Sequence, residues 1–177
     1  MRPALVIFDC DGVLVETEEI YFNMNRAFIR ERGGDFDLKY YERFIGLSSN
    51  LMWTELKEKF ALKESVPELI ALEKENKTRA LAAAALQRVT GVAGLIQELK
   101  AAGISLCVAS SGRRDNVHSI LEKIALKDNF KAIVTGEDIT RGKPAPDIFL
   151  KAAELSGFRP EQSIVIEDSR NGTLGAK

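Results

Sequence analysis

Short apolar runs and amphipathic patterns alternate along most of the chain. Four runs have the length and composition of buried strands, at Ala4–Phe8, Ile104–Ala109, Ala132–Val134 and Ser163–Ile166. Continuous apolar runs of this kind are typical of parallel strands that are covered on both faces. The pattern therefore predicts an α/β fold built on a parallel sheet.

Helical spacing fills the segments between the later strands. Apolar residues at offsets i, i+3, i+4 and i+7 occur in two segments, Val92–Leu99 and Val117–Ile124. Thr90 is the candidate N-cap of the first helix, and Gly103 is its candidate stop. Prolines within 144–146 open a third helix, because proline is tolerated in a first helical turn.

The stretch 16–86 breaks this alternation. Its apolar residues follow helical offsets, and no strand pattern of comparable strength occurs in it. The first helix of the stretch is expected to carry Ile20, Met24, Ala27 and Phe28 on one face. We therefore predict an α/β core of residues 1–15 and 87–177, interrupted by an all-helical domain of residues 16–86.

Composition limits the kinds of partner. The 177 residues are 45% hydrophobic, enough to bury a core and a modest insertion, and the formal net charge is -1. This charge gives no general attraction to nucleic acid or to an anionic membrane, so neither is expected as a partner. A small phosphorylated metabolite is the expected partner, and the chain is expected to be a monomer or weak dimer. Cys10 and Cys107 lie in apolar stretches far apart, which favours free thiols in a reducing, cytoplasmic setting. The longest apolar run is too short to span a bilayer.

Polar residues follow every predicted strand, directly or through a loop. They are Asp9, Asp11 and Gly12 after the first strand, Ser110, Ser111 and Gly112 after the second, Lys143 beyond the third, and Glu167, Asp168 and Ser169 after the fourth. The carboxyl ends of parallel strands meet at one edge, where open α/β sheets bind their ligands. We therefore expect these groups to share a single rim.

This set of groups suits one kind of chemistry. Crowded carboxylates repel one another unless a hard cation lies among them, and Mg²⁺ takes oxygen ligands. Hydroxyls, loop N–H groups and a lysine suit a phosphate group. A carboxylate can also act as a nucleophile, and a second carboxyl can transfer protons to and from the reacting oxygens.

Four segments resemble the motifs of a known family. FDCDGVL, VASSG, RGKPAPDIF and IEDSRNG are similar, in this order, to the four motifs of the haloacid dehalogenase superfamily. The helical insertion resembles the C1 cap of that superfamily, and the chain is most similar to its sugar-phosphatase and β-phosphoglucomutase branch. The resemblance implies a Rossmann-like three-layer core with the strand Ser163–Ile166 next to Ala4–Phe8. It also implies a further strand and helix beyond Lys177, which are expected to be missing from this chain.

The resemblance also implies residue roles. Asp9 is the expected nucleophile and a ligand of Mg²⁺, and Asp11 is the expected general acid/base, with its carbonyl on the metal. Asp168 is expected to bind the metal directly, and Glu167 to hold a metal-bound water. Lys143 is expected to offset the charge of the nucleophile and the phosphate. The expected substrate-binding residues are Gly12, Gly46, Ser48, Ser110, Ser111, Arg113 and Lys143.

Single residues separate the reactions known in this superfamily. Haloacid dehalogenases and phosphonatases lack an aspartate at the position of Asp11, so Asp11 favours phosphoryl transfer. β-Phosphoglucomutases place histidine where this chain has Tyr21 and arginine where it has Ser49. We therefore predict a Mg²⁺-dependent phosphatase of a small phosphorylated metabolite, such as a sugar phosphate or a phosphoglycolate-like compound. The alternatives are a β-phosphoglucomutase-like phosphomutase, a receiver-like switch, and a truncated fragment that binds Mg²⁺ and phosphate without catalysis.

Overall fold

The computed structural model describes residues 3–45 and 47–177. The chain divides into two compact units. The core unit consists of residues 1–17 and 85–177, and the helical unit consists of residues 18–84. Among the described helices, none is long and apolar enough to cross a membrane.

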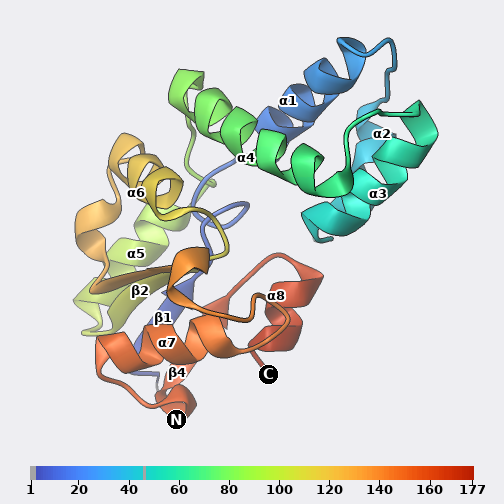
Figure 1. The fold of residues 1–177 in the computed structure, drawn as a ribbon. Coiled ribbons are helices and arrows are strands. Elements are labelled where there is room, and N and C mark those ends of the chain that lie inside the picture. The colour runs from blue at the N-terminus through green and yellow to red at the C-terminus, as the bar shows by residue number, and fades with distance from the viewer. Residues whose placement is uncertain (1–2, 46) are drawn as a thin grey trace. The chain divides into compact units, whose positions relative to one another are not determined.

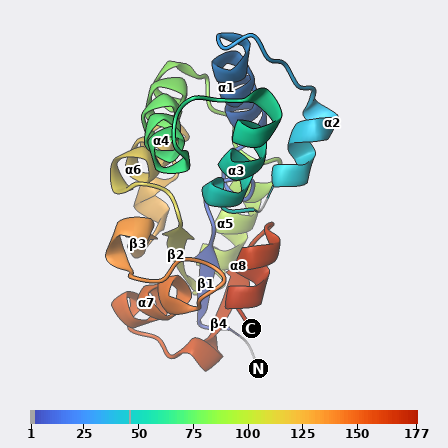
Figure 2. The ribbon, with the colours of Figure 1, turned by 45° about the vertical axis from the view of Figure 1, so that its right-hand side comes forward.

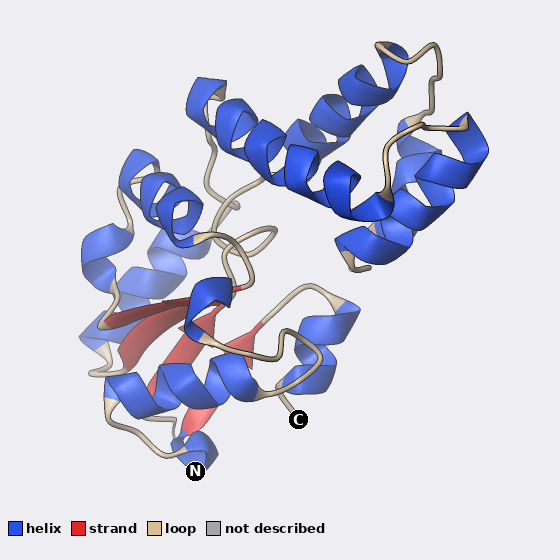
Figure 3. Ribbon diagram, viewed as in Figure 1, coloured by secondary structure: helices blue, strands red, loops and turns tan. Residues whose placement is uncertain are grey.

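A four-stranded parallel sheet forms the centre of the core unit (Figure 1, and red in Figure 3). Its strands are β1 (Leu5–Phe8), β2 (Ser105–Ser110), β3 (Ala132–Thr135) and β4 (Ser163–Ile166), in the order β3-β2-β1-β4. Phe8 at the end of β1 is in register with Val108 of β2 and Ile166 of β4. The predicted α/β class and the predicted pairing of β1 with β4 are confirmed.

Helices cover both faces of this sheet, with α7 in front of the strands and α5 behind them in Figure 2. α7 (Asp147–Ser156) packs its Ile148, Phe149, Ala152 and Ala153 on inward residues of β1, β2 and β3. α5 (Val92–Ala101) and α6 (Arg114–Lys123) contact β2 and β3. Side chains of each strand point alternately to the two faces of the sheet, and both faces are covered by helices. This explains why the strands are almost continuously apolar.

The start of α5 differs from the prediction. Its N-cap is Gly91, one residue after the predicted Thr90. Gly91 has a φ of 87°, in the left-handed region that a threonine adopts only at a cost. The geometry of the turn, and not the side-chain capping preference of threonine, fixes where this helix begins.

The helical unit encloses an aromatic core of its own. It contains α1 (Glu18–Arg30), α2 (Leu38–Tyr41), α3 (Ser49–Phe60) and α4 (Val66–Ala83). Phe28 of α1 meets Trp53 of α3 edge to face, with ring centroids 5.3 Å apart. The Trp53 N–H donates to Glu73 of α4 over 2.9 Å, so this buried carboxylate is partnered.

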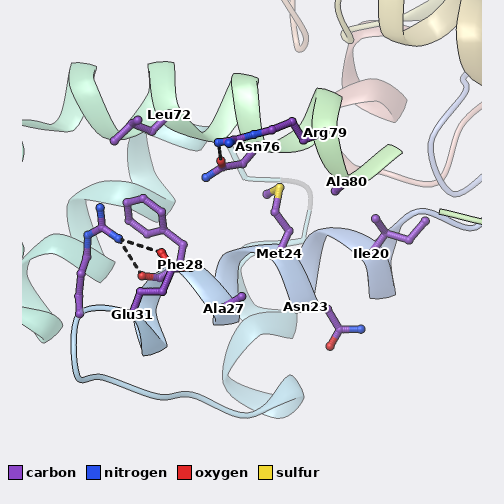
Figure 4. Close-up of a pocket in the computed structure, with 11 residues that line it drawn as sticks. Ile20, Asn23, Met24, Ala27, Phe28, Glu31, Leu72, Asn76, Arg79 and Ala80 are labelled. Carbon is purple, nitrogen blue, oxygen red and sulfur yellow. Dashed lines mark hydrogen bonds and ion pairs between the residues drawn. The ribbon is translucent and has the colours of Figure 1, made fainter. Parts of the chain in front are cut away.

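The face of α1 that carries Ile20, Met24, Ala27 and Phe28 is not the face that α1 buries most deeply. The residues that α1 buries are Phe22, Asn25, Phe28 and Ile29. Aromatic packing of Phe22 on Phe36 and Tyr41 selects this face, and Asn25 is tolerated in it because its amide donates to the Tyr41 hydroxyl. Ile20, Met24 and Ala27 instead line a groove between α1 and α4, as Figure 4 shows.

Short elements complete the described chain. The helix α8 (Arg170–Gly175) follows β4. Single 3₁₀ turns occur at η1 (Glu42–Phe44), η2 (Lys127–Asn129), η3 (Gly136–Asp138) and η4 (Pro160–Gln162).

Candidate functional site

The ends of β1 and β4 bring two acidic residues side by side. Phe8 and Ile166 are paired at the ends of these strands, so the residues that follow them, Asp9 and Glu167, leave the sheet together. The Asp9 N–H continues the ladder by donating to the Ile166 carbonyl over 2.9 Å. The backbone at Asp9 is therefore fixed by the sheet itself.

Three carboxylates gather at this edge. Asp9, Glu167 and Asp168 can each offer an oxygen, and these oxygens lie within 4.8 Å of one another. Asp9 is buried, Glu167 is half-buried when its backbone is included, and Asp168 is exposed. A set of carboxylate oxygens at this spacing fits a hard cation such as Mg²⁺ or Ca²⁺.

Lys143 reaches this cluster from the loop between β3 and α7. Its Nζ donates to Asp9 Oδ1 and to Glu167 Oε2, each over 2.6 Å. The lysine side chain is 8% exposed, and those of Asp9 and Glu167 are 10% and 3% exposed. These are buried charge-assisted hydrogen bonds, which position their partners more firmly than a surface ion pair does.

Burial has the largest effect on the pKa of Asp9, Lys143 and Asp168, and neighbouring charges modify it. Burial raises the pKa of Asp9 to about 7, and the charges of Glu167 and Asp11 add to the effect, although Lys143 opposes it. Burial also acts to lower the pKa of Lys143, but Asp9 and Glu167 together raise it above its ordinary value. Burial likewise raises the pKa of Asp168. One lysine does not fully balance the carboxylates, so the cluster is suited to accept a further cation.

Gly12 lies against the third carboxylate. Its φ is 74°, and a Cβ at this position would be 2.1 Å from Asp168 Oδ2. Only glycine combines this backbone conformation with this close approach. The structure thus gives Gly12 a steric reason for its place at the rim, beside its predicted role in binding substrate.

Asp11 is held by a residue that follows it in the same loop. Its Oδ1 accepts a hydrogen bond of 2.7 Å from the Thr17 hydroxyl, and Thr17 is fully buried. The turn between them is closed by the Gly12 N–H, which donates to the Val15 carbonyl over 2.9 Å. A buried threonine therefore sets the direction of the Asp11 carboxyl.

The predicted serines lie at the end of the neighbouring strand. Ser110 is the last residue of β2 and is buried, and its Oγ accepts from the Gly112 N–H over 3.1 Å. Ser111 follows it and is exposed. Because β2 is the neighbour of β1, both serines belong to the same carboxyl edge as Asp9.

The remaining predicted substrate-binding residues are Arg113, Ser48 and Gly46. Arg113 pairs with Asp115 through two hydrogen bonds of 3.1 and 2.8 Å, so part of its guanidinium is engaged locally. Ser48 belongs to the helical unit, where its hydroxyl caps α3 by accepting from the Leu51 N–H. Gly46 lies outside the described residues.

Two residues act at the site in ways that the sequence pattern did not identify. Thr17 was not among the expected site residues, and Ser169 was placed at the rim without a role. The signal for Thr17 is weak, since it precedes a helix and a threonine there usually acts as a cap. Ser169 is the N-cap of α8 and also donates to Glu167, and capping preference indicates only the first of these roles.

Comparisons with known proteins place this geometry in a family. The sequence profile of the haloacid dehalogenase-like hydrolases matches residues 6–177. The chain is 30% identical to a phosphorylated carbohydrates phosphatase of Thermotoga maritima, covering 97% of this chain and 79% of that protein. It is 32% identical to a β-phosphoglucomutase of Bacillus subtilis, covering 97% of this chain and 78% of that protein.

A solved structure agrees with these sequence matches. The crystal structure of CbbY from Rhodobacter sphaeroides in complex with phosphate superimposes with a TM-score of 0.76 at 25% identity, covering 98% of this chain and 81% of that one. The predicted resemblance and the prediction of a phosphatase-type enzyme are confirmed by the family match and the named phosphatase relative. On these grounds the chain belongs to the haloacid dehalogenase-like hydrolase family.

Proposed function

We propose that this protein hydrolyses the phosphate monoester of a small metabolite, with Mg²⁺ as cofactor and a phosphorylated Asp9 as intermediate. The observation that supports this most strongly is the position of Asp9, whose carboxylate lies in a buried cluster with Lys143 and two further carboxylates. A carboxylate can act as a nucleophile toward a phosphoryl group and form an acyl phosphate.

The reaction proceeds in two displacements at phosphorus. A carboxylate oxygen of Asp9 attacks the phosphorus, and the bond from phosphorus to the leaving oxygen breaks as Asp11 protonates that oxygen. In the second step Asp11 takes a proton from water, and the water oxygen attacks the phosphorus of the aspartyl phosphate. Inorganic phosphate leaves, and Asp9 is restored as a free carboxylate while Asp11 carries the proton again.

The cation fits the donor set at the rim. Asp9 and Asp168 are the proposed direct ligands together with the carbonyl of Asp11, and Glu167 is proposed to act through a water. Bound there, Mg²⁺ would supply positive charge that neutralises phosphate oxygens and lowers their repulsion of the nucleophile.

Hydrogen-bond donors around Asp9 are available to the phosphate group. A lysine has three N–H groups, and Asp9 and Glu167 take two of those of Lys143, which leaves the third for a phosphate oxygen. The Ser110 hydroxyl and the Ser111 N–H are proposed to bind further phosphate oxygens, with Gly12 and Arg113 as additional contacts.

The helical unit is proposed to act as the cap that selects the substrate. Its loop with Gly46 and Ser48 is the proposed contact with the leaving group. A sugar phosphate or a phosphoglycolate-like compound is the proposed substrate class, since a phosphorylated carbohydrates phosphatase is among the relatives. The two buried free thiols support a reducing, cytoplasmic setting.

Removal of the metal is the first test of this proposal. Chelation by EDTA is expected to abolish phosphate release from a panel of phosphorylated metabolites, and added Mg²⁺ is expected to restore it. Asp168→Asn should raise the Mg²⁺ concentration for half-maximal activity by at least about tenfold, because it weakens one ligand. Titration calorimetry gives the Mg²⁺ affinity independently of turnover, and full activity in EDTA would contradict the assignment.

Loss of the Thr17 hydroxyl is expected to impair proton transfer without removing the acid itself. Thr17→Val keeps the shape of the buried side chain but leaves Asp11 without this hydrogen bond. We expect kcat to fall on the order of tenfold, since a misdirected acid protonates the leaving oxygen poorly. A substrate whose leaving group is a good one, such as p-nitrophenol, needs less protonation and should show a smaller loss; equal losses on both substrates would argue against this role.

A phosphomutase is the second candidate, because a β-phosphoglucomutase is among the relatives at 32% identity. The phosphatase is favoured by Tyr21 and Ser49, which stand where β-phosphoglucomutases are expected to have histidine and arginine. We expect β-glucose 1-phosphate to give free phosphate or no reaction. Following the reaction by ³¹P NMR distinguishes the two, since sustained conversion to glucose 6-phosphate with little free phosphate would identify a mutase.

A further inference from the structure

Both carboxylate oxygens of Glu167 accept hydrogen bonds from protein donors. Oε2 accepts from Lys143 Nζ over 2.6 Å. Oε1 accepts from the Ser169 hydroxyl over 2.5 Å and from the Ser169 N–H over 3.1 Å. The Glu167 side chain is only 3% exposed, and it connects Ser169 to Lys143 through these hydrogen bonds.

A backbone N–H group of α8 holds the Ser169 hydroxyl in place. The Ser169 hydroxyl accepts a hydrogen bond from the Gly172 N–H over 3.0 Å, and it donates one to Glu167. Its orientation is therefore set by two partners. Gly172 is buried against the Glu167 carboxyl group, and a Cβ at this position would be 1.9 Å from Glu167 Cδ. The missing side chain of Gly172 therefore creates the space that the carboxylate fills.

We propose that Ser169 and Gly172 form a clamp on Glu167 that fixes the ammonium of Lys143 on Asp9, which makes Ser169 a positioning residue. The clamp acts through two links, from Ser169 to Glu167 and from Glu167 to Lys143. Ser169 itself does not touch the reacting atoms in this scheme. The proposal rests on the proposed function for its effect on turnover, but not for its effect on the position of Lys143.

Loss of the clamp is expected to change kcat more than KM. Without the Ser169 hydroxyl, Glu167 Oε1 keeps only the longer hydrogen bond from the backbone, and the carboxylate gains freedom to rotate. Lys143 then loses one of its two fixed partners. A displacement of about 1 Å at a catalytic group can lower the rate on the order of a hundredfold. The loss belongs in kcat more than in KM, because the geometry of the attack changes while the proposed phosphate donors Ser110 and Ser111 remain.

Ser169→Gly is the informative variant. It removes the hydroxyl, while glycine remains an acceptable N-cap for α8, so loss of capping is kept small. Ser169→Thr retains a hydroxyl at the same position and should rescue the function. The matched control is Ser65→Ala in the helical unit. Ser65 has the same arrangement, with its hydroxyl donating to Glu68 over 2.7 Å and accepting from the Glu68 N–H at the start of α4.

Two readouts are measured on the full chain, after thermal unfolding has shown that each variant is folded. In the first, steady-state hydrolysis with Mg²⁺ is expected to show kcat lowered about 10- to 100-fold in Ser169→Gly, with KM within about threefold of wild type. In the second, the rate of acetylation of Lys143 by acetic anhydride is followed by peptide mass spectrometry without substrate. This rate is expected to rise about tenfold in Ser169→Gly as the lysine loses a fixed partner. Ser169→Thr and Ser65→Ala should resemble wild type in both.

The readouts separate the clamp from the proposed function. Faster acetylation of Lys143 in Ser169→Gly, together with no hydrolysis by wild type, would support the clamp and refute the phosphatase. Unchanged acetylation and unchanged kcat in a folded Ser169→Gly would overturn the clamp. So would equal losses in Ser65→Ala, which would reveal a general effect of stability, or a failure of Ser169→Thr to rescue either readout.

Discussion

Asp9→Asn is expected to reduce phosphate release by about 10,000-fold or more, the scale on which enzymes lose turnover without their nucleophile. Asparagine has the size of aspartate, and its amide oxygen can still accept from Lys143. It lacks the negative charge that attacks phosphorus, and it is a poorer metal ligand. The substitution should therefore impair both the chemical step and metal binding.

The fold should survive this substitution. Asp9 is buried, and burial raises its pKa to about 7, so a negative charge at this position is costly in the absence of a cation. Replacing it with a neutral side chain removes that cost, and Lys143 keeps Glu167 as its charged partner. The exposed Asp128→Asn is the matched control and should retain wild-type activity. Circular dichroism tests whether the variant is folded, and phosphate release measures its turnover. A folded Asp9→Asn protein with near-normal turnover is incompatible with the mechanism.

Lys143→Met is expected to damage both activity and stability. Methionine is unbranched and only one atom shorter than lysine, but it leaves Asp9 and Glu167 without their shared cation in a buried setting. Loss of one partner of a buried ion pair costs about 3–5 kcal/mol. Loss of one donor aimed at a transferring group lowers kcat about 100- to 1,000-fold.

Unfolding in denaturant, with and without Mg²⁺, measures the first effect. Added Mg²⁺ should recover part of the lost free energy of unfolding by neutralising the carboxylates, but it should not recover kcat. Lys151→Met is the control, since the exposed pair of Lys151 with Glu154 is worth about 1 kcal/mol at most. An unfolding free energy equal to that of wild type in metal-free Lys143→Met would show that the lysine does not balance these charges.

The strand ends of the site were predictable from sequence because two simple rules converge there. Continuous apolar runs mark buried parallel strands, and parallel strands deliver the residues that follow them to one edge. This places Asp9, Ser110 and Glu167 on a shared rim without any knowledge of side-chain geometry. Lys143 is different, since its loop has no periodic pattern and its expected place came from the resemblance of RGKPAPDIF to a family motif.

The contacts that hold the site were not predictable in the same way. The hydrogen bonds of Thr17 with Asp11 and of Ser169 with Glu167 depend on which way short side chains turn in a loop. Residue spacing carries no information about that direction. The same limit applies to which face of α1 is buried, since α1 has apolar residues on more than one side and aromatic packing within the helical unit decides between them.

Detection of a phosphoryl group on Asp9 tests the central claim most directly. Enzyme mixed with Mg²⁺ and an accepted substrate is quenched in acid during the first turnover, reduced with borohydride and digested. Borohydride converts an aspartyl phosphate to homoserine with release of phosphate, so the modified position is read by mass spectrometry. Homoserine is expected at position 9 in wild type and not in Asp9→Asn. Turnover with unmodified Asp9 at every quench time, or with the label at a different residue, would contradict the central claim.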